Sequence, residues 1–186
     1  MNIKELKKIE RNRFREIRKF TTWEQKNNVK KNVEIYLKSL TSKNFLNKHI
    51  AIYWPIKDEV DLRDLKNKYY LALPKCESKG VIKFHAWDNK SPLKEDIEGI
   101  LSPDNQLLLT SENISLIFVP CLAIDKRFIR LGYGGGYYDN LRSNKLWTSI
   151  PCIGVLDSKC VSNKLLTKAK WDIPLNGYIT DKEIIL

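Results

Sequence analysis

The stretch Ser115-Leu-Ile-Phe-Val-Pro120 is a continuous apolar run of strand length that ends in a proline. Similar runs occur at 49–54, 69–74 and 152–156, each followed by polar or turn-forming residues. Strands that are apolar throughout, with helical segments between them, are typical of a parallel sheet covered on both faces. We therefore predict an α/β fold in which residues 1–186 form a single three-layer α/β/α domain with a mostly parallel central sheet.

Two further segments are predicted to extend this sheet: Val81–Ala86 as a strand, and Ile179–Leu186 as one or two short terminal strands. Ligands of such sheets bind outside the carboxyl ends of the strands. We therefore expect the site in the loops that follow Trp54, Pro74 and Pro120.

The segment Ile3–Phe20 is predicted to be an amphipathic helix, because its apolar residues fall within one arc at about 100° per residue. Basic residues three or four positions apart form a stripe beside that arc. This stripe can bind phosphates, or it can be a solvated helix flank. The apolar arc consists of Ile3, Leu6, Ile9, Phe14, Ile17 and Phe20, and the basic stripe of Lys4, Lys7, Arg11, Arg15 and Arg18.

A second helix is predicted from about Thr22 to about Leu40. Thr21 with Glu24 and Thr22 with Gln25 both have the spacing of a capping box. Apolar residues line one side of this helix, so we expect it to pack on the sheet. They are Val29, Val33, Tyr36, Leu37 and Leu40.

Composition narrows the class of protein. The apolar runs are far shorter than the roughly 20 residues that span a bilayer, and no secretory signal is visible, so we expect a cytoplasmic protein with no membrane partner. The four cysteines stand singly, without a C-x-x-C pair, which favours free thiols over a metal site. A net charge of +11 favours an anionic partner, either nucleic acid, a membrane surface or a polyanionic small molecule.

Four of the eight glycines are concentrated in Gly132-Tyr-Gly-Gly-Gly136. Successive glycine N–H groups can form a concavity that binds phosphate oxygens, particularly where a helix follows. A tight connection between strand and helix would also collect glycine. Arg130 before the loop suits phosphate, and Asp139 after it suits Mg²⁺.

Longer segments carry a resemblance to a known family. The stretch 118–125 followed by Arg130-Leu-Gly-Tyr-Gly-Gly-Gly-Tyr-Tyr-Asp139 resembles the signature of the 5-formyltetrahydrofolate cyclo-ligase family, also called 5,10-methenyltetrahydrofolate synthetase. The segments 53–61, 73–75 and 170–180 are similar to other family segments in the same order. Two positions depart from the family pattern: Ser102 replaces a common Glu, and Ile124 replaces a common aromatic residue.

The resemblance implies an ATP- and Mg²⁺-dependent ligase of folate and one-carbon metabolism, which closes 5-formyltetrahydrofolate into 5,10-methenyltetrahydrofolate. It implies that Arg130 and Tyr137 are catalytic and that Asp139 and Asp172 bind the metal. Contacts to ATP are implied for Lys7, Arg11, Arg130, Gly132, Gly134, Gly135, Gly136 and Tyr138, with Lys8 or Arg15 as alternatives for the helix contacts. Contacts to folate are implied for Trp54, Glu59, Tyr133, Gly134, Gly135, Gly136 and Tyr137.

Two alternatives remain at this stage. A basic nucleic-acid-binding protein could have kept the fold, although the sequence lacks a recognised readout motif, so nucleic acid is not the favoured partner. An ATP-dependent enzyme acting on another pterin or formamide would need the same phosphate-binding residues. We expect a monomer or a weak dimer.

Overall fold

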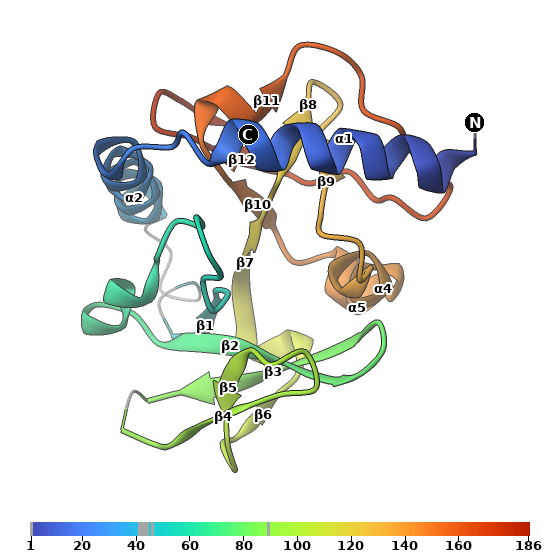
Figure 1. The fold of residues 1–186 in the computed structure, drawn as a ribbon. Coiled ribbons are helices and arrows are strands. Elements are labelled where there is room, and N and C mark those ends of the chain that lie inside the picture. The colour runs from blue at the N-terminus through green and yellow to red at the C-terminus, as the bar shows by residue number, and fades with distance from the viewer. Residues whose placement is uncertain (1, 41–44, 46, 89) are drawn as a thin grey trace.

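The computed structural model describes residues 2–40, 45, 47–88 and 90–186 (Figure 1). Within these residues the central sheet has eight strands in the order β13-β12-β10-β7-β1-β2-β3-β6. The five neighbouring strands from β12 to β2 are parallel, which confirms the mostly parallel sheet. Their bounds are β1 His49–Ala51, β2 Leu71–Ser78, β7 Ile114–Pro120, β10 Cys152–Val155 and β12 Gly177–Ile179.

The edges of the sheet are antiparallel. At one edge β3 (Val81–Trp87) pairs with β2 and β6 (Leu108–Leu109), and at the other β13 (Ile184–Ile185) pairs with β12. The prediction that the second strand ends at Pro74 was wrong, because β2 continues to Ser78 as one arm of a hairpin with β3. Pairing of β2 with β1 reaches only Ala72, so Pro74 lies where β2 has become an edge, a position that tolerates proline.

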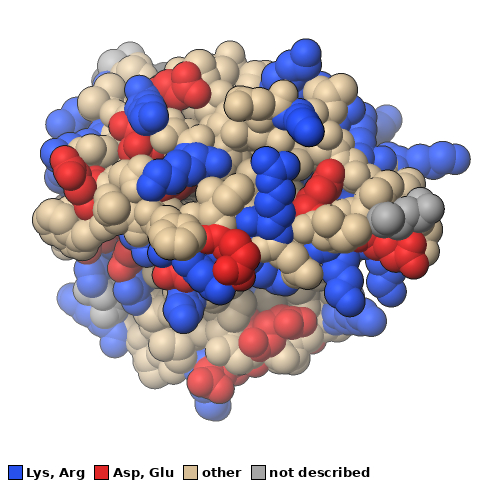
Figure 2. Space-filling view, turned by 45° about the horizontal axis from the view of Figure 1, so that its top comes forward, with Lys and Arg blue, Asp and Glu red and all other residues tan. Residues whose placement is uncertain are grey.

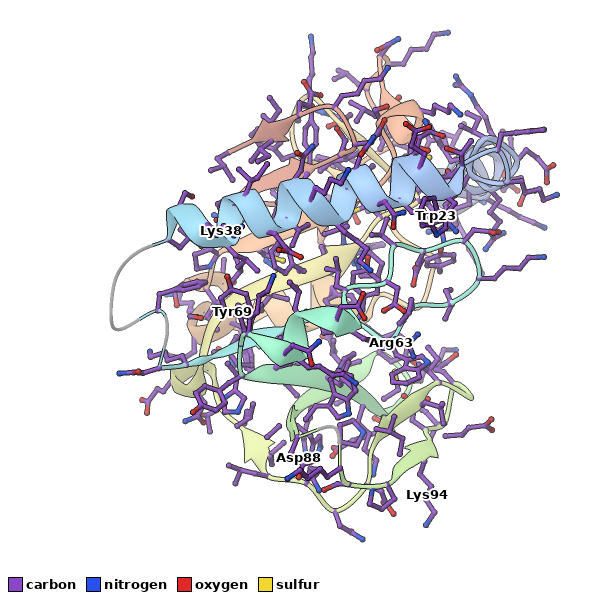
Figure 3. All side chains as sticks on the ribbon, turned by 90° about the vertical axis from the view of Figure 1, so that its left-hand side faces the viewer. Trp23, Lys38, Arg63, Tyr69, Asp88 and Lys94 are labelled. Atoms are coloured by element: carbon purple, nitrogen blue, oxygen red, sulfur yellow. The ribbon has the colours of Figure 1, made fainter. Side chains whose placement is uncertain are left out.

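Helix α2 (Trp23–Ser39) covers one face of the sheet together with the 3-10 helix η1 (Arg63–Asn67). Figure 3 shows α2 lying across this face, with Trp23 at its start and Lys38 near its end. Of the two predicted pairs, Thr22 and Gln25 form the capping box. Four of the predicted apolar residues are buried and Leu40 packs against them, which confirms the predicted contact face.

The other face carries α1 (Ile3–Arg18), α4 (Tyr137–Ser143) and α5 (Lys145–Thr148), which completes the three layers (Figure 1). Short strands outside the central sheet lie beside these helices and connect the loops on this face. A three-stranded sheet combines β8 (Ala123–Asp125), β9 (Arg130–Leu131) and β11 (Val161–Ser162). A hairpin combines β4 (Leu93–Glu95) and β5 (Leu101–Pro103), and single 3-10 turns lie at Ser111–Asn113 and Ser158–Cys160.

The predicted apolar face of α1 was largely wrong. Of the six residues in the predicted arc, only Phe14 and Ile17 pack in the core, and the other four are exposed. Besides Phe14, the buried residues of α1 are Lys7 and Arg18 of the basic stripe, whereas Lys4 and Arg15 are exposed. The reason is electrostatic: the buried face meets a carboxylate and carbonyls that pair with these two cations, so they replace part of the apolar arc.

No described helix is long and apolar enough to cross a membrane. The four cysteines are free and buried, as predicted. Ser102, one of the two departures from the family pattern, is buried in β5 and donates a hydrogen bond to the Lys94 carbonyl at 3.2 Å.

Candidate active site

A cavity of about 460 Å³ opens at the carboxyl ends of the parallel strands. Its wall includes Trp54, Pro74 and Pro120, the residues after which the site is expected, although Pro74 lies within β2 and not before a loop. Helix α1 and the β4–β5 hairpin close two further sides. Most of the predicted site residues line this cavity: Arg11, Trp54, Glu59, Arg130, Gly132, Tyr133, Gly134, Gly135, Gly136, Tyr137, Tyr138 and Asp139.

The glycine loop connects β9 to α4 and needs glycine at several positions. Gly134 has a φ of 115° and Gly136 a φ of 72°, both in a region that side chains disfavour. A Cβ on Gly132 would lie 2.7 Å from the Arg130 guanidinium. The loop therefore combines an unusual backbone path with close packing against an arginine, which accounts for the glycines in conformational terms.

Cations gather beside this loop. The Arg11 Nε donates to the Gly132 carbonyl at 2.9 Å, which joins α1 to the glycine loop. The buried Arg130 guanidinium donates to the Asp139 carboxylate at 3.2 Å and lies 5.2 Å from the Tyr138 ring centroid. Lys8 and Arg15 are exposed on the outer side of α1. Of the helix residues considered for phosphate contact, Arg11 is thus the one that lines the cavity.

The predicted residues Lys7 and Asp172 meet each other and do not line the cavity. Their buried side chains form an ion pair, and the same Asp172 oxygen accepts from the Ala169 N–H at 2.6 Å. Trp171, the neighbour of Asp172, lies on the cavity wall with 69 % of its surface exposed. The pair therefore anchors the amino-terminal half of α1 beside the cavity.

The predicted metal ligands can be tested against this geometry. Within the described residues, no three His, Cys, Asp or Glu side chains are grouped as a metal site. Mg²⁺ in nucleotide sites commonly takes only one or two carboxylates and completes its shell with phosphate oxygens and water. Asp139, partly exposed in the cavity, fits that donor set. Asp172 fits less well, because its carboxylate is buried with Lys7.

A second group of cavity residues, called the folate end below, consists of Glu59, Trp54 and Tyr133 of the glycine loop. The Glu59 side chain is 4 % exposed, and its Oε2 accepts from the Ile56 N–H at 2.9 Å. Glu59 Oε1 and the Tyr133 hydroxyl are buried and face each other, but neither makes a hydrogen bond of normal geometry with the described residues. Burial raises the pKa of the Glu59 carboxyl. Buried polar atoms without partners are costly, so this end is suited to a ligand that supplies N–H donors.

Sequence reasoning missed two residues near the cavity. Arg18 lies behind Glu59 and Tyr133, and Glu98 accepts a short hydrogen bond from the Tyr137 hydroxyl. The basic stripe of α1 contained Arg18, but a helical projection cannot tell a buried cation from a solvated one. Glu98 lies in a polar turn between β4 and β5, and nothing in its local sequence marks it.

Comparison with known proteins identifies the family. The family model described as the 5-formyltetrahydrofolate cyclo-ligase family matches residues 3–181. A protein of Haemophilus influenzae named 5-formyltetrahydrofolate cyclo-ligase is 31% identical over 138 residues, which cover 69% of this chain and 73% of that protein.

Two solved structures share the fold. The NMR structure of Aquifex aeolicus 5,10-methenyltetrahydrofolate synthetase has a TM-score of 0.77 and 31% identity, covering 97% of this chain and 92% of the other. A 5,10-methenyltetrahydrofolate synthetase from Mycoplasma pneumoniae, at 23% identity, has a TM-score of 0.69 and covers 97% of this chain and 99% of its own. The resemblance found in the sequence is confirmed, and the chain belongs to the 5-formyltetrahydrofolate cyclo-ligase family.

Proposed function

We propose that the protein is a 5-formyltetrahydrofolate cyclo-ligase that uses ATP and Mg²⁺ to form 5,10-methenyltetrahydrofolate, ADP and phosphate. One observation carries the proposal: a single cavity is lined by the cations Arg11 and Arg130 beside the glycine loop and by the buried Glu59 carboxylate and Tyr133 hydroxyl, which make no normal hydrogen bond. The first end suits the phosphates of a nucleotide. The second suits a heterocycle that presents several N–H groups.

At the folate end, the Glu59 carboxylate is proposed to accept hydrogen bonds from the amino and ring N–H groups of the pterin. Trp54 and Tyr133 provide flat surfaces beside it. The Trp54 ring already carries a guanidinium on one face, because Arg63 lies 4.2 Å from its centroid, and it packs edge-on against Trp87. A rigid aromatic wall of this kind favours a planar ligand.

At the nucleotide end, Arg11 and Arg130 are proposed to contact the phosphates of ATP together with the N–H groups of the glycine loop. Lys7 belongs to this set through its place on α1, one turn before Arg11. Tyr138 is proposed to contact the nucleotide from the start of α4. Charge-assisted hydrogen bonds from arginine to phosphate are strong and directional.

The proposed reaction transfers the γ-phosphoryl group to the formyl oxygen, with release of ADP. Nitrogen 10 of the folate then attacks the formyl carbon and gives up its proton to the departing phosphate as the C–O bond breaks. Arg130 neutralises charge on the transferred group. Tyr137 stays protonated at neutral pH, because desolvation and its hydrogen bond to Glu98 raise its pKa to about 12. Its one O–H is donated to Glu98, so the hydroxyl oxygen is proposed to offer an acceptor between the two substrates.

Mg²⁺ supplies further neutralisation of phosphate charge when bound, and Asp139 is the carboxylate proposed to hold it in the cavity. Asp172 is proposed as a second ligand of the metal. To bind it, the Asp172 carboxylate would have to release its ion pair with Lys7. We also propose that residues 1–186 act as one domain, as a monomer or weak dimer in the cytoplasm. Buried free thiols suit that reducing compartment.

Nucleic-acid binding is less well supported. Lys7, Arg11 and Arg18 point from α1 into the protein and are paired there, so they do not form an outer phosphate-binding stripe. Figure 2 shows Lys and Arg spread over the face in view with Asp and Glu between them. A nucleic-acid groove needs a continuous basic surface.

The test is the formation of the methenyl product from 5-formyltetrahydrofolate, followed by its absorbance near the visible edge. We expect product only when ATP and Mg²⁺ are both present. Reactions lacking each component, and reactions with 5-formyltetrahydrofolate replaced by another formamide, are the controls. A folded preparation that forms no product would refute the proposal, whereas turnover of the other formamide alone would identify the alternative enzyme.

A further inference from the structure

Arg18 is buried beside Glu59 and Tyr133, two of the candidate folate-binding residues. Its guanidinium lies 3.8 Å from Glu59 Oε1 and 5.4 Å from the centroid of the Tyr133 ring. A third contact fixes the side chain, because its NH2 donates to the Lys57 carbonyl at 2.8 Å. Only 8 % of the Arg18 side chain is exposed. Arg18 lies behind the cavity wall, so it reaches a ligand only through Glu59 and Tyr133.

The groups that face Glu59 explain why this arginine matters. Tyr53, Tyr133, Tyr138 and Cys121 lie near enough to the carboxyl to feel its charge, from the segment after β1, the glycine loop, α4 and the segment after β7. Burial raises the pKa of each of these four groups, so they are uncharged at neutral pH. Among the described residues facing Glu59, Arg18 is the cation that offsets the cost of a buried carboxylate charge.

We propose that Arg18 is a positioning residue that keeps the Glu59 carboxylate ionised and directed at the folate end of the cavity. The proposal rests on the assignment of that end to folate. An ionised carboxylate accepts two N–H donors at once, whereas a protonated one presents an O–H in place of one acceptor. Because Arg18 and Arg11 lie on the same helix, α1 contributes to both ends of the cavity.

The test uses Arg18→Gln in the full-length enzyme, with steady-state kinetics from about pH 5.5 to 8.5. We expect the KM for 5-formyltetrahydrofolate to rise roughly tenfold at the acidic end, the size that follows the loss of one partner of a buried charge pair. The KM for ATP should change less than about twofold. The defect should shrink as pH rises, since Glu59 ionises at higher pH when Arg18 is absent.

Three further variants separate positioning from general structural damage. Arg18→Lys keeps the charge and should restore much of the folate affinity. Lys19→Gln removes a neighbouring charge whose ion pair, within the described part of the chain, is with Glu16 on the surface, and it should leave both KM values unchanged. In a Glu59→Gln background, Arg18→Gln should have little additional effect on folate affinity, because the group through which it acts is already neutral.

A folate defect that is constant across pH, equal changes in both KM values, or additive effects in the double variant would overturn the proposal. If Arg18→Gln does not fold, the pH dependence of the Arg18→Lys variant decides the question in the same way. Failure of wild-type turnover would instead refute the proposed function. The two failures are therefore distinguishable.

Discussion

The charged groups at the two ends of the cavity differ in whether they have hydrogen-bond partners within the protein. At the nucleotide end every candidate cation already has a partner: Arg130 pairs with Asp139, Lys7 with Asp172, and Arg11 with the Gly132 carbonyl. At the folate end the Glu59 Oε1 and the Tyr133 hydroxyl make no hydrogen bond of normal geometry with the described residues. The cations at the nucleotide end are hydrogen-bonded within the protein, whereas the Glu59 carboxylate has the Arg18 cation at 3.8 Å but an Oε1 that makes no hydrogen bond.

This difference implies two modes of ligand binding. The phosphates of a nucleotide must replace the carboxylates and the carbonyl that already pair with these cations. The net gain in binding free energy per contact is therefore small. We expect the metal and the phosphates to bind together. A pterin supplies donors to groups that otherwise lack them, so each hydrogen bond is gained without losing another. Variants at the first end should act on catalysis and on ion pairing, and variants at the second on folate affinity and on stability.

The largest effect is expected from Arg130→Gln. Loss of the guanidinium that neutralises the transferred phosphoryl group should reduce kcat/KM by roughly 10⁴-fold, within the range known for arginines in phosphoryl transfer. Arg127→Gln is the matched control, since Arg127 pairs with Asp125 away from the cavity and its loss should lower stability while sparing kcat/KM. Equal activity losses in both variants, measured at equal folded fraction, would mean that Arg130 acts only through the fold.

A second effect concerns the buried Lys7–Asp172 pair. Lys7→Met should destabilise the protein by roughly 3–4 kcal/mol, because it leaves a buried carboxylate without its cation. The double variant Lys7→Met/Asp172→Asn should recover most of that loss, since Asn still accepts from the Ala169 N–H. Urea denaturation measures the free energy of unfolding of the single and the double variant. Recovery of stability without recovery of activity would support the ATP and metal roles, and recovery of both would show that the pair is purely structural.

A smaller effect is expected from Asp139→Asn, which keeps an acceptor for Arg130 but removes the charge. The Mg²⁺ concentration for half-maximal activity should rise roughly 30-fold, as when the ligand set of a metal is weakened, with little change in melting temperature. Asp64→Asn is the control, because Asp64 is an exposed carboxylate paired with Lys30. An unchanged Mg²⁺ requirement would remove Asp139 from the metal site and leave it as the partner of Arg130.

The same contrast explains what the sequence could predict. Four of the five parallel strands were predicted from continuous apolar runs, such as 115–120, whose composition indicates burial on both faces of the sheet. The fifth, β12 (Gly177–Ile179), begins two residues before the predicted terminal strands. The glycine loop was recognisable because its composition is unusual. In contrast, strands of two or three residues, such as β9 and β11, leave no detectable period.

The orientation of α1 was missed for a different reason. A helical projection assigns lysine and arginine to the solvent side, yet Lys7 and Arg18 are buried because their partners, Asp172 and Glu59, come from segments 165 and 41 residues away. Only tertiary structure reveals such pairs. The same holds for Glu98, whose role becomes visible only through its contact with Tyr137.

The smallest expected effect is a gain in stability from Glu59→Gln. The folded-state pKa of Glu59 is raised above the ordinary value of 4.5 by burial. The protonated form is therefore favoured by folding, and this contribution is present below pH 4.5 and lost as pH rises through the folded-state pKa. At pH 7.5 the variant should melt roughly 2–4 °C above the wild type, the shift expected for about 1 kcal/mol in a domain of this length.

At about pH 4 the difference should vanish, because Glu59 is then protonated in both the folded and unfolded states. Melting curves of the wild type and of Glu59→Gln at the two pH values measure this difference in melting temperature. Glu112→Gln, at an exposed carboxyl, is the control. A variant that is less stable than the wild type at pH 7.5 would show that Arg18 more than offsets the burial of the charge. The folate end would then be as well neutralised as the nucleotide end, and the contrast between the two would fail.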